Sequence, residues 1–301
     1  MSLIEACPKP GIYCDIPFDE YLSWAAISNS SLHAAAKSMA HYNAQQPVEE
    51  TPPMRLGTLC HAGKFEPLLI SQQYAVVPES KFAAEVRKPD GSMYDSPRGS
   101  KAYKELVADF KEKHAGKIFV SDTEFNTMLG VVRALSLHER ASEYLAVRTE
   151  TQNEVAIVWI DEETGLLCKG RVDCLQRDRR LVGDLKTTAD ASQFHNVIAR
   201  RGYHRQGAFY LDGLEQLTGV EHTFTITAVE TSSPYDVQAA PLSAEAINIG
   251  RTQYRTLLRQ IAECREANVW PGSESPEEWQ LPAWALGPDT MRVESGVLVS
   301  W

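Results

Sequence analysis

Apolar segments in the second half of the chain predict a β-sheet. Val155, Ile157 and Trp159 alternate with residues that are also apolar, so both faces of this segment are hydrophobic and a buried strand is expected. Polar turns at 161–165 and 177–180, and a Ser-Ser-Pro turn at 232–234, separate further apolar segments. The other predicted strands are LLCKGRVDCLQ (166–176), LVGDLKTT (181–188), HTFTITAVET (222–231) and YDVQAAPL (235–242).

Helical periodicity dominates the first half and returns later. Within 122–147, apolar residues recur at helical spacing from Phe125 through Met128 and Val132 to Leu135. The other predicted helices cover 27–46, with Ser28 or Ser30 as N-cap, 54–66, 100–114, two segments of 190–217 that divide near Gly202, and 243–267. Residues 80–100 mix Pro, Gly, Ser and charge without a period, and we expect a mobile loop or lid there.

These elements predict an α/β protein with a mixed central sheet flanked by helices and a helical N-terminal half. Residues 1–150 form the helical part, residues 151–270 form the sheet-containing core, and residues 271–301 form a tail rich in Trp and Pro. We expect the helical part to pack on the core as one unit. No internal repeat or low-complexity segment occurs in the sequence.

Composition excludes several classes of protein. The 301 residues are 43% hydrophobic and 23% charged, which excludes collagen-like, disordered and coiled-coil chains. No run of 18 apolar residues and no secretory signal pattern occurs, so we expect no membrane contact and a cytoplasmic location. Six cysteines form no C-x-x-C pair, which is typical of free thiols in a reducing compartment.

The net charge of −10 argues against a protein that coats nucleic acid without sequence preference. Such proteins gain affinity from Lys and Arg side chains that displace phosphate counterions. An enzyme that holds a metal ion with carboxylates and gathers its basic groups on one surface is still compatible with this charge.

Three polar residues on two neighbouring strands predict a site for a divalent cation. Asp184 and Lys186 are two apart on one strand and therefore share a face. A hairpin through the 177–180 turn brings Asp173 beside Asp184. Paired carboxylates suit Mg²⁺, which prefers oxygen ligands and keeps several waters. The competing interpretation is an exposed ion pair worth only about 0–1 kcal/mol.

The motifs together resemble the RecB-type PD-(D/E)XK nucleases and, among them, the RecE-type exonucleases, which are related in architecture to lambda exonuclease. The resemblance depends on G-R-V-D (170–173), G-D-L-K-T-T (183–188) and the helical pair Gln206 and Tyr210. Upstream, L-G-T-L-C-H (56–61) matches the motif that supplies a histidine to the metal site. Weaker matches, including L-P-x-W at 281–284, extend the resemblance over nearly the whole chain.

The resemblance implies roles for individual residues. The implied metal ligands are His61, Asp173, Asp184 and the backbone carbonyl of Leu185, with Lys186 as the catalytic lysine. Gln206 and Tyr210 are four apart on one helix face and would orient the attacking water or the scissile phosphate. Glu66 and Glu154 are expected behind the ligands, although Glu154 fits a strand-end charge equally well.

Candidate DNA contacts are less specific. The candidates are Ser28, Ser30, Arg171, Arg200, Arg201 and Arg205. Ser28 and Ser30 stand where a helix begins, which suits either a phosphate or a plain N-cap. Lambda exonuclease carries an arginine shortly before the corresponding serine, but residues 18–24 here contain no basic residue. Recognition of the DNA end is therefore left open between Lys37, Arg55 and the loop expected over 81–101.

By resemblance, the protein is a Mg²⁺-dependent exodeoxyribonuclease, with Mn²⁺ as the alternative ion. It would degrade linear double-stranded DNA from the 5′ end and leave 3′ single-stranded overhangs for homologous recombination. Relatives form rings around DNA, so we expect a homo-oligomer, a single-strand annealing protein as partner, and a phage or prophage origin.

Other functions have less support. An iron–sulfur cluster or a structural zinc site would need several cysteines near the core, and only Cys264 follows it. No G-x-S-x-G motif supports a serine hydrolase. Two alternatives are left: an endonuclease with the same fold, and a DNA-binding recombination accessory protein without activity.

Overall fold

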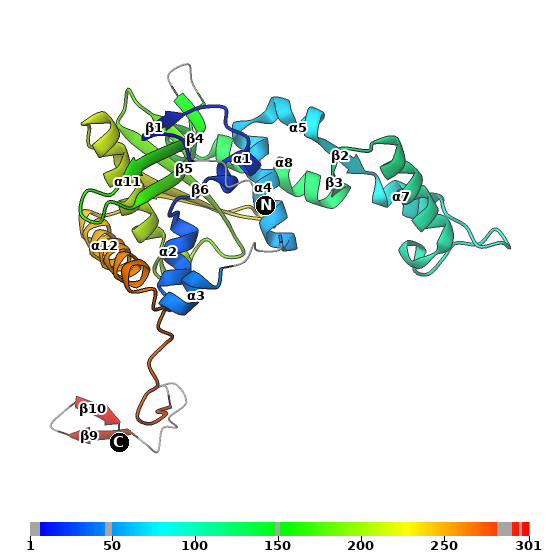
Figure 1. Cartoon of the computed structure of the whole chain (residues 1–301). Coiled ribbons are helices and arrows are strands. Elements are labelled where there is room, and N and C mark those ends of the chain that lie inside the picture. Colours follow the sequence, from blue (N-terminus) through cyan, green and yellow to red (C-terminus); the bar gives the residue numbers. More distant parts are fainter. Residues whose placement is uncertain (1–6, 46–49, 148–150, 282–290, 295–296, 301) are drawn as a thin grey trace.

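The computed structural model describes residues 7–45, 50–147, 151–281, 291–294 and 297–300. Its centre is one mixed six-stranded sheet in the order β1-β4-β5-β6-β7-β8, shown in Figure 1. The strands are β1 (Gly11–Tyr13), β4 (Thr151–Ile160), β5 (Leu167–Gln176), β6 (Leu181–Thr188), β7 (Thr223–Glu230) and β8 (Val237–Pro241). All neighbouring pairs are antiparallel except β6 and β7. The predicted α/β fold with a mixed sheet is therefore confirmed.

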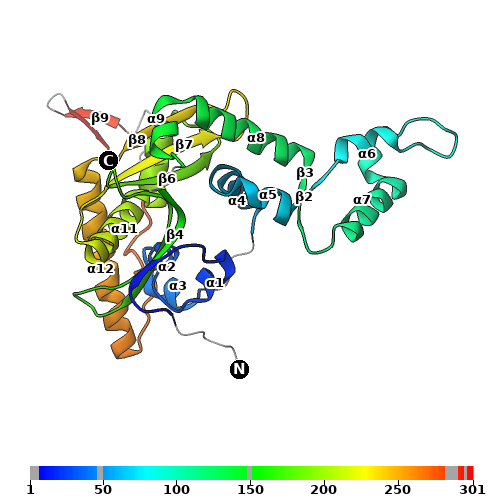
Figure 2. The same ribbon diagram turned by 90° about the horizontal axis from the view of Figure 1, so that it is seen from above.

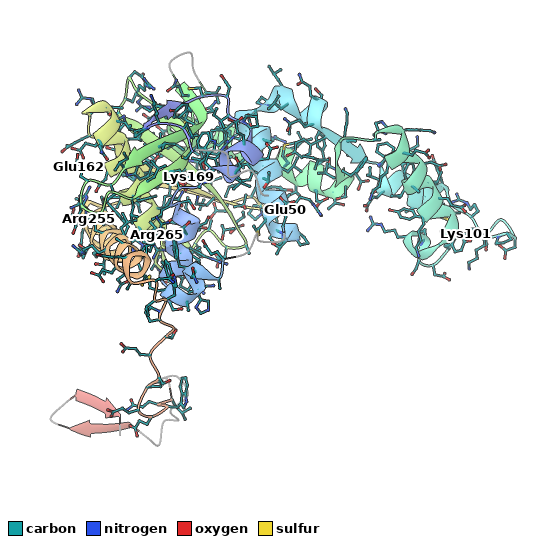
Figure 3. All side chains as sticks on the ribbon, viewed as in Figure 1. Glu50, Lys101, Glu162, Lys169, Arg255 and Arg265 are labelled. Atoms are coloured by element: carbon teal, nitrogen blue, oxygen red, sulfur yellow. The ribbon has the colours of Figure 1, made fainter. Side chains whose placement is uncertain are left out.

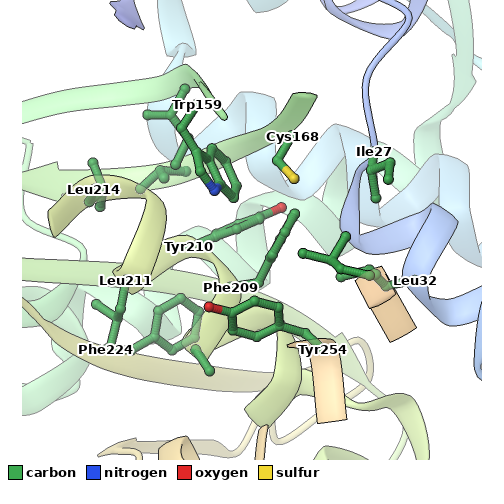
Figure 4. Close-up of a cluster of buried hydrophobic side chains, with 14 of the residues drawn as sticks. Ile27, Leu32, Trp159, Cys168, Phe209, Tyr210, Leu211, Leu214, Phe224 and Tyr254 are labelled. Atoms are coloured by element: carbon green, nitrogen blue, oxygen red, sulfur yellow. The ribbon is translucent and has the colours of Figure 1, made fainter. Parts of the chain in front are cut away.

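Five helices and their core cover one face of the sheet. They are α2 (Asn29–Ala35), α3 (Met39–Asn43), α10 (Phe194–Arg201), α11 (Tyr203–Thr218) and α12 (Ala244–Ala267). Figure 4 shows their core, in which Phe209 and Tyr210 of α11 lie among Trp159, Leu32 and Tyr254. Gly202 adopts a left-handed conformation (φ 68°) that ends α10 and starts α11, as the predicted division requires.

Three helices cover the opposite face with a second core. They are α4 (Pro52–Phe65), α8 (Asp122–Leu137) and α9 (Glu139–Tyr144). Leu59 of α4 and Leu135 of α8 pack with Leu185 of β6, all of them fully buried. Ser121 and Glu124 form a capping box that fixes the start of α8. The sheet therefore lies between two helical layers, and the N-terminal part packs directly on the core.

Residues 67–121 form an arm that stands away from the body in Figures 1 and 2. A short parallel pair, β2 (Tyr74–Val77) with β3 (Ile118–Ser121), forms its neck. The arm also contains α5 (Pro67–Gln73), α6 (Glu79–Glu85), the 3-10 turn η1 (Pro97–Gly99) and α7 (Lys101–Lys113). Figure 3 shows Lys101 far from the body, which contains Lys169. The expectation of a loop over 80–100 is therefore wrong at both ends, where α6 and η1 form.

Other boundaries also differ from the sequence prediction. The helix expected over 27–46 is two helices, because Ser38 accepts a hydrogen bond from the His41 N–H and starts α3. The helix expected over 122–147 stops at Leu137, and α9 follows. Near the start, α1 (Phe18–Ser23) forms in a segment for which no element was predicted, and β9 (Met291–Glu294) pairs with β10 (Val297–Ser300) in the tail. Pro282 and Trp284 of the tail motif lie outside the described residues. None of the described helices is long and apolar enough to cross a membrane.

Candidate metal-dependent active site

The site lies where β5 and β6 separate. Their ladder ends at the pair Cys174–Gly183, and the next two residues facing each other are Asp173 and Asp184. Instead of a further ladder bond, the Leu185 N–H donates to Asp173 Oδ2 at 2.8 Å. Both carboxylates are buried, so their charges interact in a medium of low dielectric constant. This is the adjacency that the hairpin predicts.

Asp184 is held from two sides. Lys186 Nζ lies 2.8 Å from Asp184 Oδ1 and 2.8 Å from Oδ2, which confirms that the two side chains share a face. From α11, the Gln206 amide donates to Asp184 Oδ1 at 2.9 Å. The Lys186 ammonium also lies 4.8 Å from the centre of the Tyr203 ring. The sheet and α11 therefore fix the position of the lysine together.

His61 enters from the opposite helical layer. Gly57, one turn earlier on α4, faces β6: a Cβ there would be in ordinary van der Waals contact, 3.4 Å from Thr187 Oγ1. His61 Nε2 lies 2.9 Å from the carbonyl oxygen of Leu185. Its Nδ1 lies 3.5 Å from Glu154 Oε1 and 3.6 Å from Asp173 Oδ2. The imidazole thus connects the Leu185 carbonyl with two carboxylates.

Glu154 completes a cluster of three candidate metal ligands. One ligand atom each from His61, Glu154 and Asp173 lies within 4.8 Å of the other two. Glu154 has a φ of 50°, in the left-handed region, which costs a non-glycine residue about 1–2 kcal/mol. The Arg171 Nε–H donates to Glu154 Oε2 at 2.8 Å and holds it there. The sequence left Glu154 undecided; its register opposite Asp173 across the β4–β5 hairpin is the signal that would have placed it in the site.

Burial and neighbouring charges shift the pKa values of these groups. Burial, with the nearby charge of Asp184, raises the pKa of Asp173 to about 7 despite His61 and Lys186. Burial opposes protonation of His61, but Asp173 and Glu154 outweigh it and raise its pKa to about 9. Although burial opposes it, the carboxylates of Asp184 and Asp173 raise the pKa of Lys186, which keeps it an ammonium ion. The opposite holds for Glu154: His61 and Arg171 lower its pKa against the effect of burial.

The donor set fits a hard divalent cation. Asp184 Oδ2 is buried and accepts no hydrogen bond from the described residues, although the Lys186 ammonium is near. Carboxylates, a carbonyl oxygen and one imidazole suit Mg²⁺ or Mn²⁺. His61, Glu154 and Asp173 would hold the ion. Of the four ligands implied by the resemblance, His61 and Asp173 belong to the three-residue cluster, whereas Asp184 and the Leu185 carbonyl do not.

Two other predicted residues lie farther from this cluster. Tyr210 belongs to the hydrophobic core, and its ring packs against Gly170, where a Cβ would be 2.7 Å from Cε1. Glu66 follows α4, where burial and the charge of Glu154 raise its pKa. Direct contact of either side chain with a substrate is still a prediction.

The candidate DNA contacts differ in their surroundings. Ser28 forms a capping box with Ser31 at the start of α2, whereas Ser30 is exposed. Arg171 donates to Glu154 and to the carbonyl oxygen of Ile16, so its guanidinium is occupied inside the protein. Arg200 and Arg201 are exposed in the last turn of α10, and Arg205 is buried in α11.

Comparisons with known proteins agree with this geometry. Residues 25–278 match the family model of a PDDEXK-like domain of unknown function (DUF3799). A crystal structure from Eubacterium rectale, described as a "Putative exonuclease", is 13% identical, with a TM-score of 0.54 over 90% of this chain and 96% of that one. At that identity the similarity shows a shared fold. A second solved chain, SSO0001, is also 13% identical over 75% of this chain and 86% of its own, but its TM-score of 0.26 supports no conclusion. No curated protein matches the chain. The chain thus belongs to the PDDEXK-like domain family DUF3799.

Proposed function

We propose that this protein is a metal-dependent exodeoxyribonuclease that acts on linear double-stranded DNA. The observation that carries the proposal is the convergence of Asp184, Lys186 and Gln206 with the His61–Glu154–Asp173 cluster at one break in the sheet. Membership of a PDDEXK-like family supports nuclease chemistry at this position. Digestion from the 5′ end, overhangs for recombination, a ring-shaped homo-oligomer and an annealing partner are proposals that depend on the RecE-like motifs.

The residues divide the chemistry among them. A bound Mg²⁺ supplies a Lewis acid that stabilises charge on a phosphoryl oxygen and lowers the pKa of a bound water. Lys186, kept protonated by its carboxylate neighbours, places a fixed positive charge beside the reacting phosphate. Gln206 holds Asp184 in place, and Arg171 does the same for Glu154.

The test is digestion of duplexes labelled separately at the 5′ and 3′ ends, with Mg²⁺ present. The wild type should release 5′-terminal nucleotides first and leave a covalently closed circle intact, while Asp184→Ala should release none. Nicking of the closed circle would favour the endonuclease. Equal release by the wild type and Asp184→Ala would refute the catalytic assignment. No release by either, with DNA still bound, would favour the non-catalytic accessory protein.

A further inference from the structure

Arg205 is a buried cation without a partner among the described residues. It is 6% exposed, and its Nε–H donates no hydrogen bond. No carboxylate of the described part of the chain forms an ion pair with its guanidinium. Every other strongly buried charge near the site has a partner: Asp173, Asp184 and Lys169 all form hydrogen bonds.

An unpaired buried guanidinium opposes folding. Arginine is almost never fully buried unless its charge is paired, because its hydration is lost without compensation. Burial alone lowers the pKa of Arg205, and no neighbouring carboxylate opposes that effect. The desolvation cost of the Arg205 guanidinium is compensated if a bound anion pairs with it in the functional state of the protein.

The surroundings of Arg205 are basic. His33 of α2 has a lowered pKa, first because of burial and then because of the charges of Arg205, Lys37 and Arg201. All the charged groups that act on His33 are therefore cations. Gly202 makes room for the guanidinium, because a Cβ there would lie 2.8 Å from Arg205 Nη2. Groups from α2, α10 and α11 meet here in a protein whose net charge is −10.

We propose that Arg205, with Arg201, Lys37 and His33, forms a subsite for one phosphate group of the DNA substrate. The assignment of DNA as the carrier rests on the proposed nuclease function. Arg205 and Gln206, whose amide donates to Asp184, are consecutive on α11 and point in different directions, so one helix carries both the subsite and a residue that holds the catalytic carboxylate. A guanidinium matches phosphate in charge and geometry. The phosphate is either a 5′-terminal monoester or an internal diester.

The experiment compares the wild type with Arg205→Met in EDTA, so that DNA is bound and not cut. Arg133→Met, which removes an exposed arginine from α8, is the matched control. Arg205→Lys restores the charge without the planar guanidinium. Two measurements are made on each protein: the melting temperature with and without inorganic phosphate, and the anisotropy of a labelled 20-base-pair duplex with a 5′-phosphate or a 5′-hydroxyl end.

Arg205→Met should have a melting temperature no lower than that of the wild type, because it removes an unpaired buried charge. It should lose the increase in melting temperature caused by phosphate and bind the duplex about tenfold to a hundredfold more weakly. Its salt dependence, log K against log salt, should become shallower by about 0.9. Arg205→Lys should be intermediate, and Arg133→Met should match the wild type.

The two DNA ends identify the source of the phosphate. If wild type prefers the 5′-phosphorylated duplex and Arg205→Met does not, the subsite takes the terminal phosphate. If Arg205→Met binds the 5′-phosphate and 5′-hydroxyl duplexes more weakly than the wild type by the same factor, the subsite takes an internal phosphodiester.

Two results would overturn the subsite. One is that Arg205→Met binds phosphate and DNA as tightly as the wild type. The other is that Arg205→Met melts at a lower temperature than the wild type without phosphate, which would mean that Arg205 has a structural partner within the protein. The two proposals can fail separately. If Arg205→Met loses phosphate binding but the wild type does not cut DNA with Mg²⁺ present, the subsite stands and the nuclease function is refuted.

Discussion

Two clusters of charged side chains in this protein are built in different ways. Between α11 and α12, the Asp212 carboxylate accepts hydrogen bonds from Arg251 at 2.7–3.0 Å, from the Tyr254 hydroxyl at 2.5 Å and from Arg255 at 3.2 Å, the last labelled in Figure 3. Both of its oxygens are satisfied. At the β5–β6 break, by contrast, three carboxylates converge on one lysine, one histidine and one arginine, and the two oxygens of Asp184 share the Lys186 ammonium.

The difference separates a stabilising cluster from a functional one. The Asp212 carboxylate is paired with two arginines that both reach solvent, and the cluster joins two helices without backbone strain at Asp212. The site gathers three carboxylates, two of them buried, and holds Glu154 in a left-handed conformation, features that oppose folding unless cations compensate them. We therefore expect substitutions in the site to affect activity, and substitutions in the Asp212 cluster to affect stability.

The largest effect should come from Lys186→Gln. Glutamine can still donate to Asp184 but carries no charge, so the rate of DNA hydrolysis should fall about a thousandfold. Release of acid-soluble nucleotides measures it, with the exposed Lys104→Gln on the arm as matched control. Activity within a few fold of the wild type would remove Lys186 from the mechanism.

Asp212→Asn should show the reverse pattern. Removing this charge leaves the Arg251 and Arg255 guanidinium groups uncompensated, and the free energy of unfolding should fall by about 2–3 kcal/mol, less than for a fully buried pair because both arginines are partly exposed. Urea denaturation measures it. Activity per folded molecule should be unchanged; a loss of activity without a loss of stability would contradict the division between the clusters.

Glu154→Gln tests whether Glu154 belongs to the ligand set. Losing one carboxylate of three should weaken Mn²⁺ binding about tenfold to a hundredfold. Glu66→Gln is the matched control: it lies near Glu154 but outside the ligand cluster, so its effect should be much smaller. Calorimetric titration with Mn²⁺ compares them, and equal effects of both variants would place Glu154 behind the ligands.

The last prediction concerns the effect of pH on cation binding. A cation must displace the protons of Asp173, whose pKa is raised to about 7, and of His61, whose pKa is raised to about 9. Affinity should therefore rise between pH 6 and 9, by up to tenfold per unit for each proton released, as titration at several pH values would show.

The stability of the metal-free protein should change in the opposite direction. Both pKa values are raised on folding, so the stability they contribute is complete below the unfolded values, about 3.9 for Asp and 6.5 for His. It is lost as the pH rises through about 7 for Asp173 and about 9 for His61. A cation affinity independent of pH would contradict this assignment.

The sequence predicts the core of the fold better than its periphery. The strand LVGDLKTT and the division at Gly202 are observed as predicted, because both depend on local periodicity and one glycine. The pair β2–β3 and the division of 27–46 are not predicted. The former joins segments about 40 residues apart, and the latter depends on the cap formed by Ser38.

The site, like the fold, is predictable where it depends on local pattern and not where it depends on tertiary packing. Alternation along one strand places Asp184 beside Lys186, and a short hairpin places Asp173 next to them. Glu154 depends on the register of β4 with β5, and the unpaired burial of Arg205 depends on how α2 packs near α11. Neither follows from periodicity, because both need the tertiary arrangement.

The most direct test of the central claim is calorimetric titration of Mn²⁺ into wild type, Asp173→Asn and Asp212→Asn near pH 8. If His61, Glu154 and Asp173 hold one cation, wild type and Asp212→Asn should bind Mn²⁺ saturably, and Asp173→Asn should bind it at least tenfold more weakly. Equal binding by wild type and Asp173→Asn would contradict the claim that these residues form the metal site.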